Sequence, residues 1–161
     1  MSALPVLVRT ARLGLPLWTA EDVAAIRGGG RRPGWHGDFP RRDDVDAATL
    51  WHDGDTWGPR SVVRGVTVLG SIGFYGPPEP ATDGVAEVEV GYGLVAEARG
   101  WGFMTEALTA LLAECDRVGV RVRASVAPDN KTSIKVLASC GFTELRGATE
   151  DGELVMVRPL R

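Results

Sequence analysis

The feature that most constrains this chain is a strand in its second half that runs through two glycines directly into a helix. Residues 85–95 alternate, with Glu87 and Glu89 on one face and apolar side chains on the other, which is typical of a half-buried strand. After the turn, apolar residues recur at helical spacing as far as Val118. The turn consists of Arg99, Gly100, Trp101, Gly102, Phe103, Met104 and Thr105. Glycines let backbone N–H groups at a helix N-terminus approach an anion, so the turn predicts a phosphate or pyrophosphate site; a tight turn that merely needs two glycines is the alternative.

Length, charge and cysteine content limit the classes of protein. The 161 residues fit one domain spanning 1–161, large enough to bury its own core. The net charge of −3 argues against a broad basic surface for nucleic acid or an anionic membrane. Cys115 and Cys140 show neither metal-type spacing nor a disulfide framework, so no metal site is expected. Arg9 and Arg12 come too early for a signal peptide and no run of about 18 apolar residues occurs, which together predict a soluble cytoplasmic protein.

The remaining elements follow from local patterns. A strand is expected over 6–13, and Thr19 and Asp22 form a capping-box pattern for a first helix. Asp43 and Asp44 are expected to cap a second helix over 45–51. The other expected elements are a hairpin of 61–64 with 66–75 turning near Gly65, a loop over 76–80, a strand over 120–126, a helix from Asn130 to Gly141, and strands over 143–146 and 154–158. The predicted order is therefore strand, two helices, three strands, helix, strand, helix and two strands.

Two other phosphate-binding patterns are absent or misplaced. The run from Gly91 to Ala96 formally matches the dinucleotide fingerprint, but it lies inside a strand, where its glycines cannot present a helix terminus. No G-x-x-x-x-G-K-[ST] sequence occurs, which removes the P-loop nucleotide hydrolases.

Several short motifs occur together in a characteristic order. They are Glu89-Val-Gly-Tyr92, Leu94-Val95, Arg99-Gly-Trp-Gly102, Asn130-Lys-Thr-Ser133 and Cys140-Gly-Phe142. In this order the chain resembles the GNAT superfamily of acetyl-CoA-dependent N-acetyltransferases, and within it the RimJ/RimL-type branch, over roughly residues 87–146. The resemblance implies an α/β (α+β) GNAT fold: a mixed, mostly antiparallel sheet of about seven strands flanked by about four helices. Its two central parallel strands, 85–95 and 120–126, would splay apart to admit the cofactor.

The same resemblance implies acetyl-CoA as cofactor. The turn after the strand would wrap the pyrophosphate, backbone at Leu94 and Val95 would pair with the pantetheine arm, and Asn130 would contact it. The family pattern ends in a small residue where this chain has Met104, which is tolerable if backbone N–H groups bind the phosphate and costs affinity if the small residue makes room for it. The full set of expected cofactor residues is Leu94, Val95, Arg99, Gly100, Trp101, Gly102, Phe103, Met104, Thr105, Asn130, Ser133 and Lys135.

The few lysines of the chain lie together, in the helix expected after Asn130, and can contribute to binding the cofactor. Lys131 and Lys135 are the only lysines and lie four residues apart, so they share one helix face that can meet the 3′-phosphate of CoA. An ordinary solvated helix face is the alternative.

The chemistry needs a base and a way to release the thiolate. An aliphatic amine has a pKa of about 10.4, so a nearby base assists its attack at neutral pH. We expect Glu89 to be this base, with a solvated face or arginine pairing as the alternative, and a backbone N–H near Val95 to meet the oxyanion. Many relatives place an acid tyrosine where this chain has Leu137. Ser133 is the candidate acid instead, with helix capping as its alternative role.

The acceptor is expected between the first two helices. Trp35, His36, Asp38 and Phe39 can hold a cationic amine there, or can be a loop anchored by aromatic packing. The sequence thus predicts acetyl transfer from acetyl-CoA to a primary amine, a protein N-terminus or a small molecule, by a protein that can form a homodimer. The alternative is a non-catalytic module that binds or senses acyl-CoA.

Overall fold

The computed structural model describes residues 3–161. Its strands are β1 (Leu7–Arg9), β2 (Gly14–Pro16), β3 (Arg60–Arg64), β4 (Thr67–Phe74), β5 (Glu79–Pro80), β6 (Ala86–Leu94), β7 (Arg121–Val126), β8 (Glu144–Ala148) and β9 (Leu154–Arg158). Its helices are α1 (Ala20–Gly28), α2 (Arg42–Ala48), the short 3-10 turn η1 (Ala96–Ala98), α3 (Phe103–Arg117) and α4 (Lys131–Ser139).

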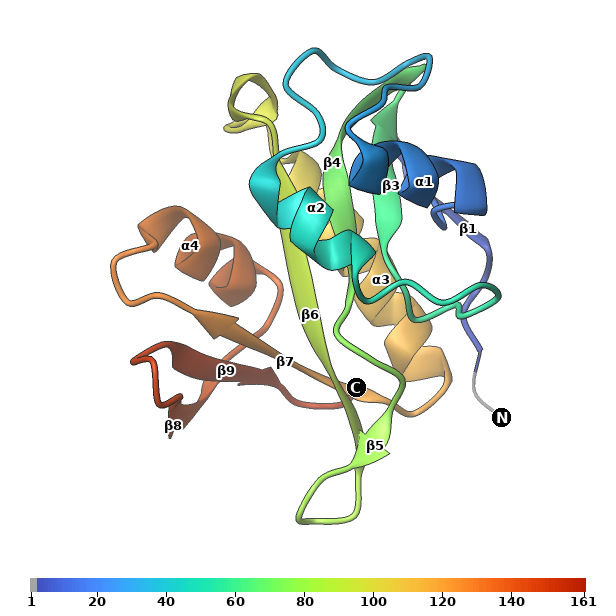
Figure 1. The fold of residues 1–161 in the computed structure, drawn as a ribbon. Helices are drawn as coiled ribbons and strands as arrows, with labels where there is room; N and C mark the ends of the chain where they lie inside the picture. Colours follow the sequence, from blue (N-terminus) through green and yellow to red (C-terminus); the bar gives the residue numbers. More distant parts are fainter. Residues whose placement is uncertain (1–2) are drawn as a thin grey trace.

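The strands form one sheet with α1 and α2 on one face and α3 on the other (Figure 1). The strand order is β1-β2-β3-β4-β6-β7-β9-β8, and β5 pairs with β6. Among residues 3–161, all nine strands pair antiparallel except β6 and β7, which run parallel. The predicted mixed, mostly antiparallel sheet with a central parallel pair is confirmed, with more strands than the seven expected. No helix in this part of the chain has both the length and the apolar character to cross a membrane.

The extra strands come from two local departures. The strand expected over 6–13 is observed only as β1. The Thr10 hydroxyl and N–H both bond Leu13 and close a turn, after which the chain returns as β2. The loop over 76–80 contains β5, whose Glu79 and Pro80 pair with Glu87 and Ala86.

Helix starts follow the capping chemistry. The capping box predicted for α1 is present, with Thr19 and Asp22 bonding each other's backbone N–H groups. The start of α2 differs: the helix begins at Arg42, three residues before the expected start. Asp44 accepts from the backbone N–H of Arg41 at 2.8 Å and thereby fixes the first turn.

The parallel strands β6 and β7 pair over only three residues and then separate. Glu87, Val88 and Glu89 register with residues 121–123, and beyond Glu89 the two strands keep only their outer partners, β4 for β6 and β9 for β7. In Figure 1 the strands diverge from this point, and α4 lies at the open end. The predicted splay is therefore confirmed, and within residues 3–161 it leaves one edge of β6 without a strand partner from Val90 to Leu94.

The apolar face of α3 fixes the sheet behind this split. The helical spacing predicted from the sequence is confirmed, because every predicted apolar position in the helix is buried: Phe103, Ala107, Leu108, Leu111, Leu112 and Cys115. Full burial of each large apolar side chain is worth about 1.5–3 kcal/mol, so the start of α3 is held firmly under the end of β6.

Candidate functional site

The turn between β6 and α3 presents free backbone donors. Gly100 and Gly102 have φ of 83° and 80°, which favours glycine, and Gly102 is the N-cap of α3. In residues 3–161 no side chain caps this helix, and its first hydrogen bond runs from the N–H of Glu106 to the carbonyl of Gly102. The N–H groups before Glu106 are those that a helix leaves without internal partners. A Cβ on Gly100 would meet open space, so an anion can approach the turn.

The side chains of Arg99 and Met104 fix the turn against its surroundings. Arg99 donates from Nε to the carbonyl of Leu94 at 3.2 Å, which ties the turn to the end of β6. Met104, the departure from the family pattern, is buried and forms part of the cleft wall with Leu94 and Val136. Its side chain therefore packs inward while its backbone remains in the first turn of α3. Trp101 is largely exposed.

Two hollows join into one groove, here called the β6 groove, which runs from this turn into the split between β6 and β7. The first, about 380 Å³, lies over the turn and is also lined by Thr105 and Lys135. The second, about 300 Å³, lies in the split and is lined by Tyr92, Gly93, Asn130 and Ser133 among others. The two share the wall residues Leu94, Arg99, Met104, Thr132 and Val136.

The free edge of β6 supplies backbone groups to this groove. The N–H of Val95 donates to Leu69 at 2.8 Å, and the carbonyl of Glu89 accepts from Tyr75, so these residues bond toward β4. Because backbone groups alternate along a strand, those of Tyr92 and Leu94 point toward β7 and the split. The N–H of Val95 is thus already used and does not face the split, so it is not available to an oxyanion there.

Two hydroxyl groups, one from β6 and one from α4, are hydrogen-bonded to each other in the split. The sequence predicted Ser133 here as a candidate acid but assigned no acid to β6. The Tyr92 and Ser133 hydroxyls are 2.7 Å apart, while the backbone N–H of Ser133 donates to the Asn130 side chain, which caps α4. Burial raises the pKa of Tyr92 to about 12, so this phenol stays protonated at neutral pH. Leu137 is buried and provides no acid. Tyr92 is the last residue of the Glu89-Val-Gly-Tyr92 motif, and strand alternation predicted that its side chain lies on the strand face opposite to that of Glu89. Neither observation assigned a chemical role to Tyr92.

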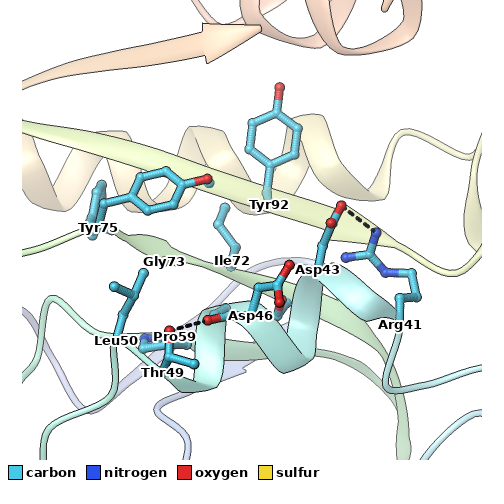
Figure 2. Close-up of a pocket in the computed structure, with 14 residues that line it drawn as sticks. Arg41, Asp43, Asp46, Thr49, Leu50, Pro59, Ile72, Gly73, Tyr75 and Tyr92 are labelled. Atoms are coloured by element: carbon cyan, nitrogen blue, oxygen red, sulfur yellow. Dashed lines mark hydrogen bonds and ion pairs between the residues drawn. The ribbon is translucent and has the colours of Figure 1, made fainter. Parts of the chain in front are cut away.

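A second cavity, here called the α2 pocket, adjoins the groove on the α2 side of the sheet (Figure 2). It measures about 420 Å³ and lies between α2, β4 and β6, with Asp46, Leu50 and Tyr75 in its wall. Arg41, Asp43 and Tyr92 line both this pocket and the groove, so the two cavities meet at these residues. The sequence analysis missed this pocket, because residues 41–50 show only a short helix pattern.

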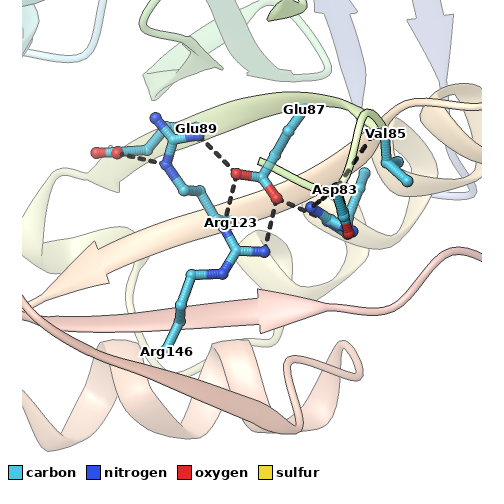
Figure 3. A network of polar contacts seen from close by, with 7 residues as sticks. Asp83, Val85, Glu87, Glu89, Arg123 and Arg146 are labelled. Atoms are coloured by element: carbon cyan, nitrogen blue, oxygen red, sulfur yellow. Dashed lines mark hydrogen bonds and ion pairs between the residues drawn. The ribbon is translucent and has the colours of Figure 1, made fainter. Parts of the chain in front are cut away.

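Glu89 belongs to an arginine network. Its neighbour Glu87 is buried and accepts hydrogen bonds from Arg121, Arg123 and Arg146 (Figure 3). Burial alone would raise the pKa of Glu87, but these hydrogen bonds outweigh it and lower the pKa to about 2. Glu89 is a quarter exposed and bonds Arg123 at 3.2 Å, as the arginine-pairing alternative expects. Both carboxylates line a hollow of about 260 Å³ that shares only Tyr75 with the α2 pocket.

The segment from Trp35 to Phe39 lies outside the α2 pocket. Phe39 is buried in the core and packs edge-on against Trp35 with ring centroids 5.1 Å apart. His36 contacts Glu97 at 3.2 Å and accepts from the backbone N–H of Asp38 at 3.0 Å. The aromatic-packing alternative describes these contacts.

The sequence and the fold have clear relatives. The family model of the acetyltransferase (GNAT) domain matches residues 12–143. The chain therefore belongs to the GNAT acetyltransferase family, a class of acetyl-CoA-dependent N-acetyltransferases, as the motifs predicted.

Solved structures agree with the fold. An acetyltransferase from Agrobacterium tumefaciens str. C58 is 24% identical, with 98% of this chain and 95% of that chain covered and a TM-score of 0.68. A ribosomal-protein-S5-alanine acetyltransferase from Vibrio fischeri is 18% identical, covering 97% of each chain with a TM-score of 0.68. RimJ of Mycobacterium smegmatis in complex with CoA-disulfide is 21% identical, covering 95% and 87% with a TM-score of 0.62. No curated protein matches the sequence.

Proposed function

We propose that this chain transfers an acetyl group from acetyl-CoA directly to a primary amine held in the α2 pocket. The observation that carries the proposal is that the β6 groove, which begins at free helix N–H groups, meets a separate pocket at Arg41, Asp43 and Tyr92. Such a layout lets two substrates approach one point from opposite faces of the sheet.

The residues present fit acetyl-CoA, which supplies an activated acetyl thioester when bound. The uncapped start of α3 and the open space at Gly100 suit the pyrophosphate. The unpartnered edge of β6, with backbone groups of Tyr92 and Leu94 facing the split, suits the amides of the pantetheine arm. Lys135 lines the groove beside the turn, whereas Lys131 does not. In this assignment Asn130 orders α4 next to the arm, and Val95 contributes by tying β6 to β4.

Direct transfer requires two proton movements. The amine nitrogen bonds to the thioester carbonyl carbon, the C=O electrons move to oxygen, and their return breaks the C–S bond. The amine nitrogen loses a proton, which we assign to Glu89 through the hollow beside Tyr75. The departing thiolate gains a proton, which we assign to Ser133 with Tyr92 hydrogen-bonded behind it.

The α2 pocket favours a cationic acceptor. Asp43 and Asp46 both line it and are exposed, so their carboxylates attract an ammonium group before it loses its proton. We place the acceptor here and not against Trp35, His36, Asp38 and Phe39. A protein N-terminus is one such amine, and the Vibrio fischeri relative is named for ribosomal protein S5 alanine; a small-molecule amine is the other.

A mass-spectrometric assay tests the proposal. The protein is incubated with acetyl-CoA and a panel of N-terminal peptides and small amines, free thiol is measured, and acetylated products are identified. We expect acetyl-CoA binding by titration calorimetry and at least one acetylated primary amine. Binding without turnover on any amine would support the acyl-CoA-binding module instead.

A further inference from the structure

Arg41 occupies the point where the β6 groove meets the α2 pocket. Its guanidinium lies over Gly93 so closely that a Cβ on Gly93 would collide with it. Gly93 neighbours Tyr92 and Leu94, whose backbone groups face the split. The positive charge therefore lies against the stretch of β6 that separates the two cavities.

A buried carboxylate fixes this guanidinium. Asp44 is fully buried and accepts from Nε and Nη2 of Arg41 at 3.1 and 3.0 Å, a bidentate geometry that orients the planar group. Asp44 also accepts from the backbone N–H of Arg41 and from the Ser71 hydroxyl. Four hydrogen bonds thus converge on one carboxylate, which compensates the cost of burying its charge.

The arginine keeps donors that no protein group uses. A guanidinium carries five N–H groups, and Asp44 takes one from Nε and one from Nη2. Within residues 3–161, Nη1 has no hydrogen-bond partner; its ion pair with Asp43 spans 3.9 Å, beyond hydrogen-bond distance (Figure 2). The side chain is about one-fifth exposed and lines both cavities, so these donors are accessible from them.

We propose that Arg41 is a catalytic residue that donates from Nη1 to the thioester carbonyl oxygen as negative charge develops there, with Asp44 and Ser71 as positioning residues. The inference rests on the proposed function and deepens it. When the amine nitrogen bonds to the carbonyl carbon, the electron pair that moves to oxygen meets a prepositioned cation, and the pair returns when the C–S bond breaks. Preorganised donors of this kind stabilise the transition state more than the ground state.

Three variants test the role of the guanidinium. Arg41→Gln removes the charge, Arg41→Lys keeps the charge but loses the fork, and Arg42→Gln removes a neighbouring exposed arginine as the matched control. We expect Arg41→Gln to lower kcat by about 100- to 1,000-fold, with the Kd of acetyl-CoA changed by less than about threefold. Arg41→Lys should recover only part of this loss, and Arg42→Gln should behave as wild type.

A spectroscopic measurement reads the contact without turnover. Carbon-13 NMR of acetyl-CoA labelled at the acetyl carbonyl, bound without acceptor, should show a downfield shift in the wild type and in Arg42→Gln. The shift should be smaller in Arg41→Gln. Ser71→Ala, which removes one support of Asp44 with little change in packing, should reduce the shift and kcat partially, and Asp44→Asn should reduce both further where it folds.

The outcomes separate the inference from the proposed function. If the wild type neither binds acetyl-CoA nor acetylates any amine, both fail. If the wild type is active and Arg41→Gln keeps its kcat or its carbonyl shift, the inference alone fails. If Arg41→Gln raises only the KM of the acceptor, Arg41 binds acceptor and the inference is equally overturned.

Discussion

Two buried carboxylates in this protein are bound by arginine, and they differ in how many arginines share them and in where those arginines lie. Glu87 is shared by Arg121, Arg123 and Arg146, which join β6, β7 and β8, and two of these arginines also bind Asp83 or Glu89. Asp44 binds one arginine, Arg41, whose Nη1 is accessible from both cavities. The comparison teaches that charge burial alone does not mark a reactive site. Unused donors beside a hollow do not mark one either, because within residues 3–161 Nη2 of Arg123 is also unbonded and Arg123 lines the hollow beside Tyr75. What distinguishes Arg41 is its place where the groove meets the α2 pocket.

The largest expected contrast is in kcat. Glu87→Gln leaves three arginines without their shared carboxylate, and breaking such a buried pair costs about 3 kcal/mol. We expect urea unfolding to show this loss, with kcat at low denaturant close to wild type. Arg41→Gln should also lose stability, because it takes two hydrogen bonds from the buried Asp44, but it should in addition lower kcat at low denaturant by about 100- to 1,000-fold. If Glu87→Gln lowered kcat as strongly as Arg41→Gln, the distinction between the two clusters would collapse.

Glu89 bonds Arg123 of the Glu87 cluster and is also the proposed base, and its substitution distinguishes a structural role from a catalytic one. As the base, Glu89→Gln should lower kcat by about 100-fold and remove the lower limb of the pH–rate profile. As a mere partner of Arg123, it should change only stability, by under about 1 kcal/mol. Asp43→Asn is the matched comparison in the α2 pocket. A changed profile in Asp43→Asn together with an unchanged one in Glu89→Gln would transfer the base role to Asp43.

Tyr92 tests the groove side of the same strand. Tyr92→Phe removes the hydroxyl that lies 2.7 Å from Ser133. Thiolate is already a good leaving group, so we expect a loss of only about tenfold in kcat. Ser133→Ala and the double variant should show nearly the same loss if the two hydroxyls act together. Additive losses would show that they act separately.

The acid dependence of stability tests the Glu87 cluster without a change in the active site. Because the pKa of Glu87 is about 2 in the folded protein and about 4.5 ordinarily, its contribution is complete above pH 4.5. It is lost as the pH falls from 4.5 toward 2. The melting temperature should therefore fall more steeply with decreasing pH for the wild type than for Glu87→Gln. Parallel curves would mean that Glu87 is not held in its charged form by the arginines.

The second half of the fold could be predicted because local patterns and tertiary packing agree there. The alternation of β6, the glycine turn and the helical spacing of α3 each correspond to an observed element. The first half was less predictable: Thr10 closes a turn within an apolar run, and Asp44 starts α2 early by bonding Arg41. Both effects depend on single side-chain hydrogen bonds, which periodicity does not register.

The site shows the same division. The glycine turn was visible from sequence because it consists of consecutive residues between a strand and a helix, and the split was implied by the resemblance to the family. Arg41 and the α2 pocket were not, since about 50 residues separate Arg41 from Gly93 and only the folded sheet brings them together. The aromatic segment at Trp35 was expected near the acceptor from its position in the chain, but position gave no information on which cavity it faces.

The space above Gly91 and Gly93 on β6 bears on how the acceptor specificity of such an enzyme can evolve. Tyr75 fills the space over Gly91, and Arg41 fills the space over Gly93, while Tyr92 between them faces the opposite side of the sheet. Arg41 lines both cavities and Gly93 lines the groove, so a mutation at either also reaches the side proposed for acetyl-CoA. Gly91 and Tyr75 line the α2 pocket and not the groove, so under the proposed function new acceptors can evolve by changes at this pair while the groove is inherited intact.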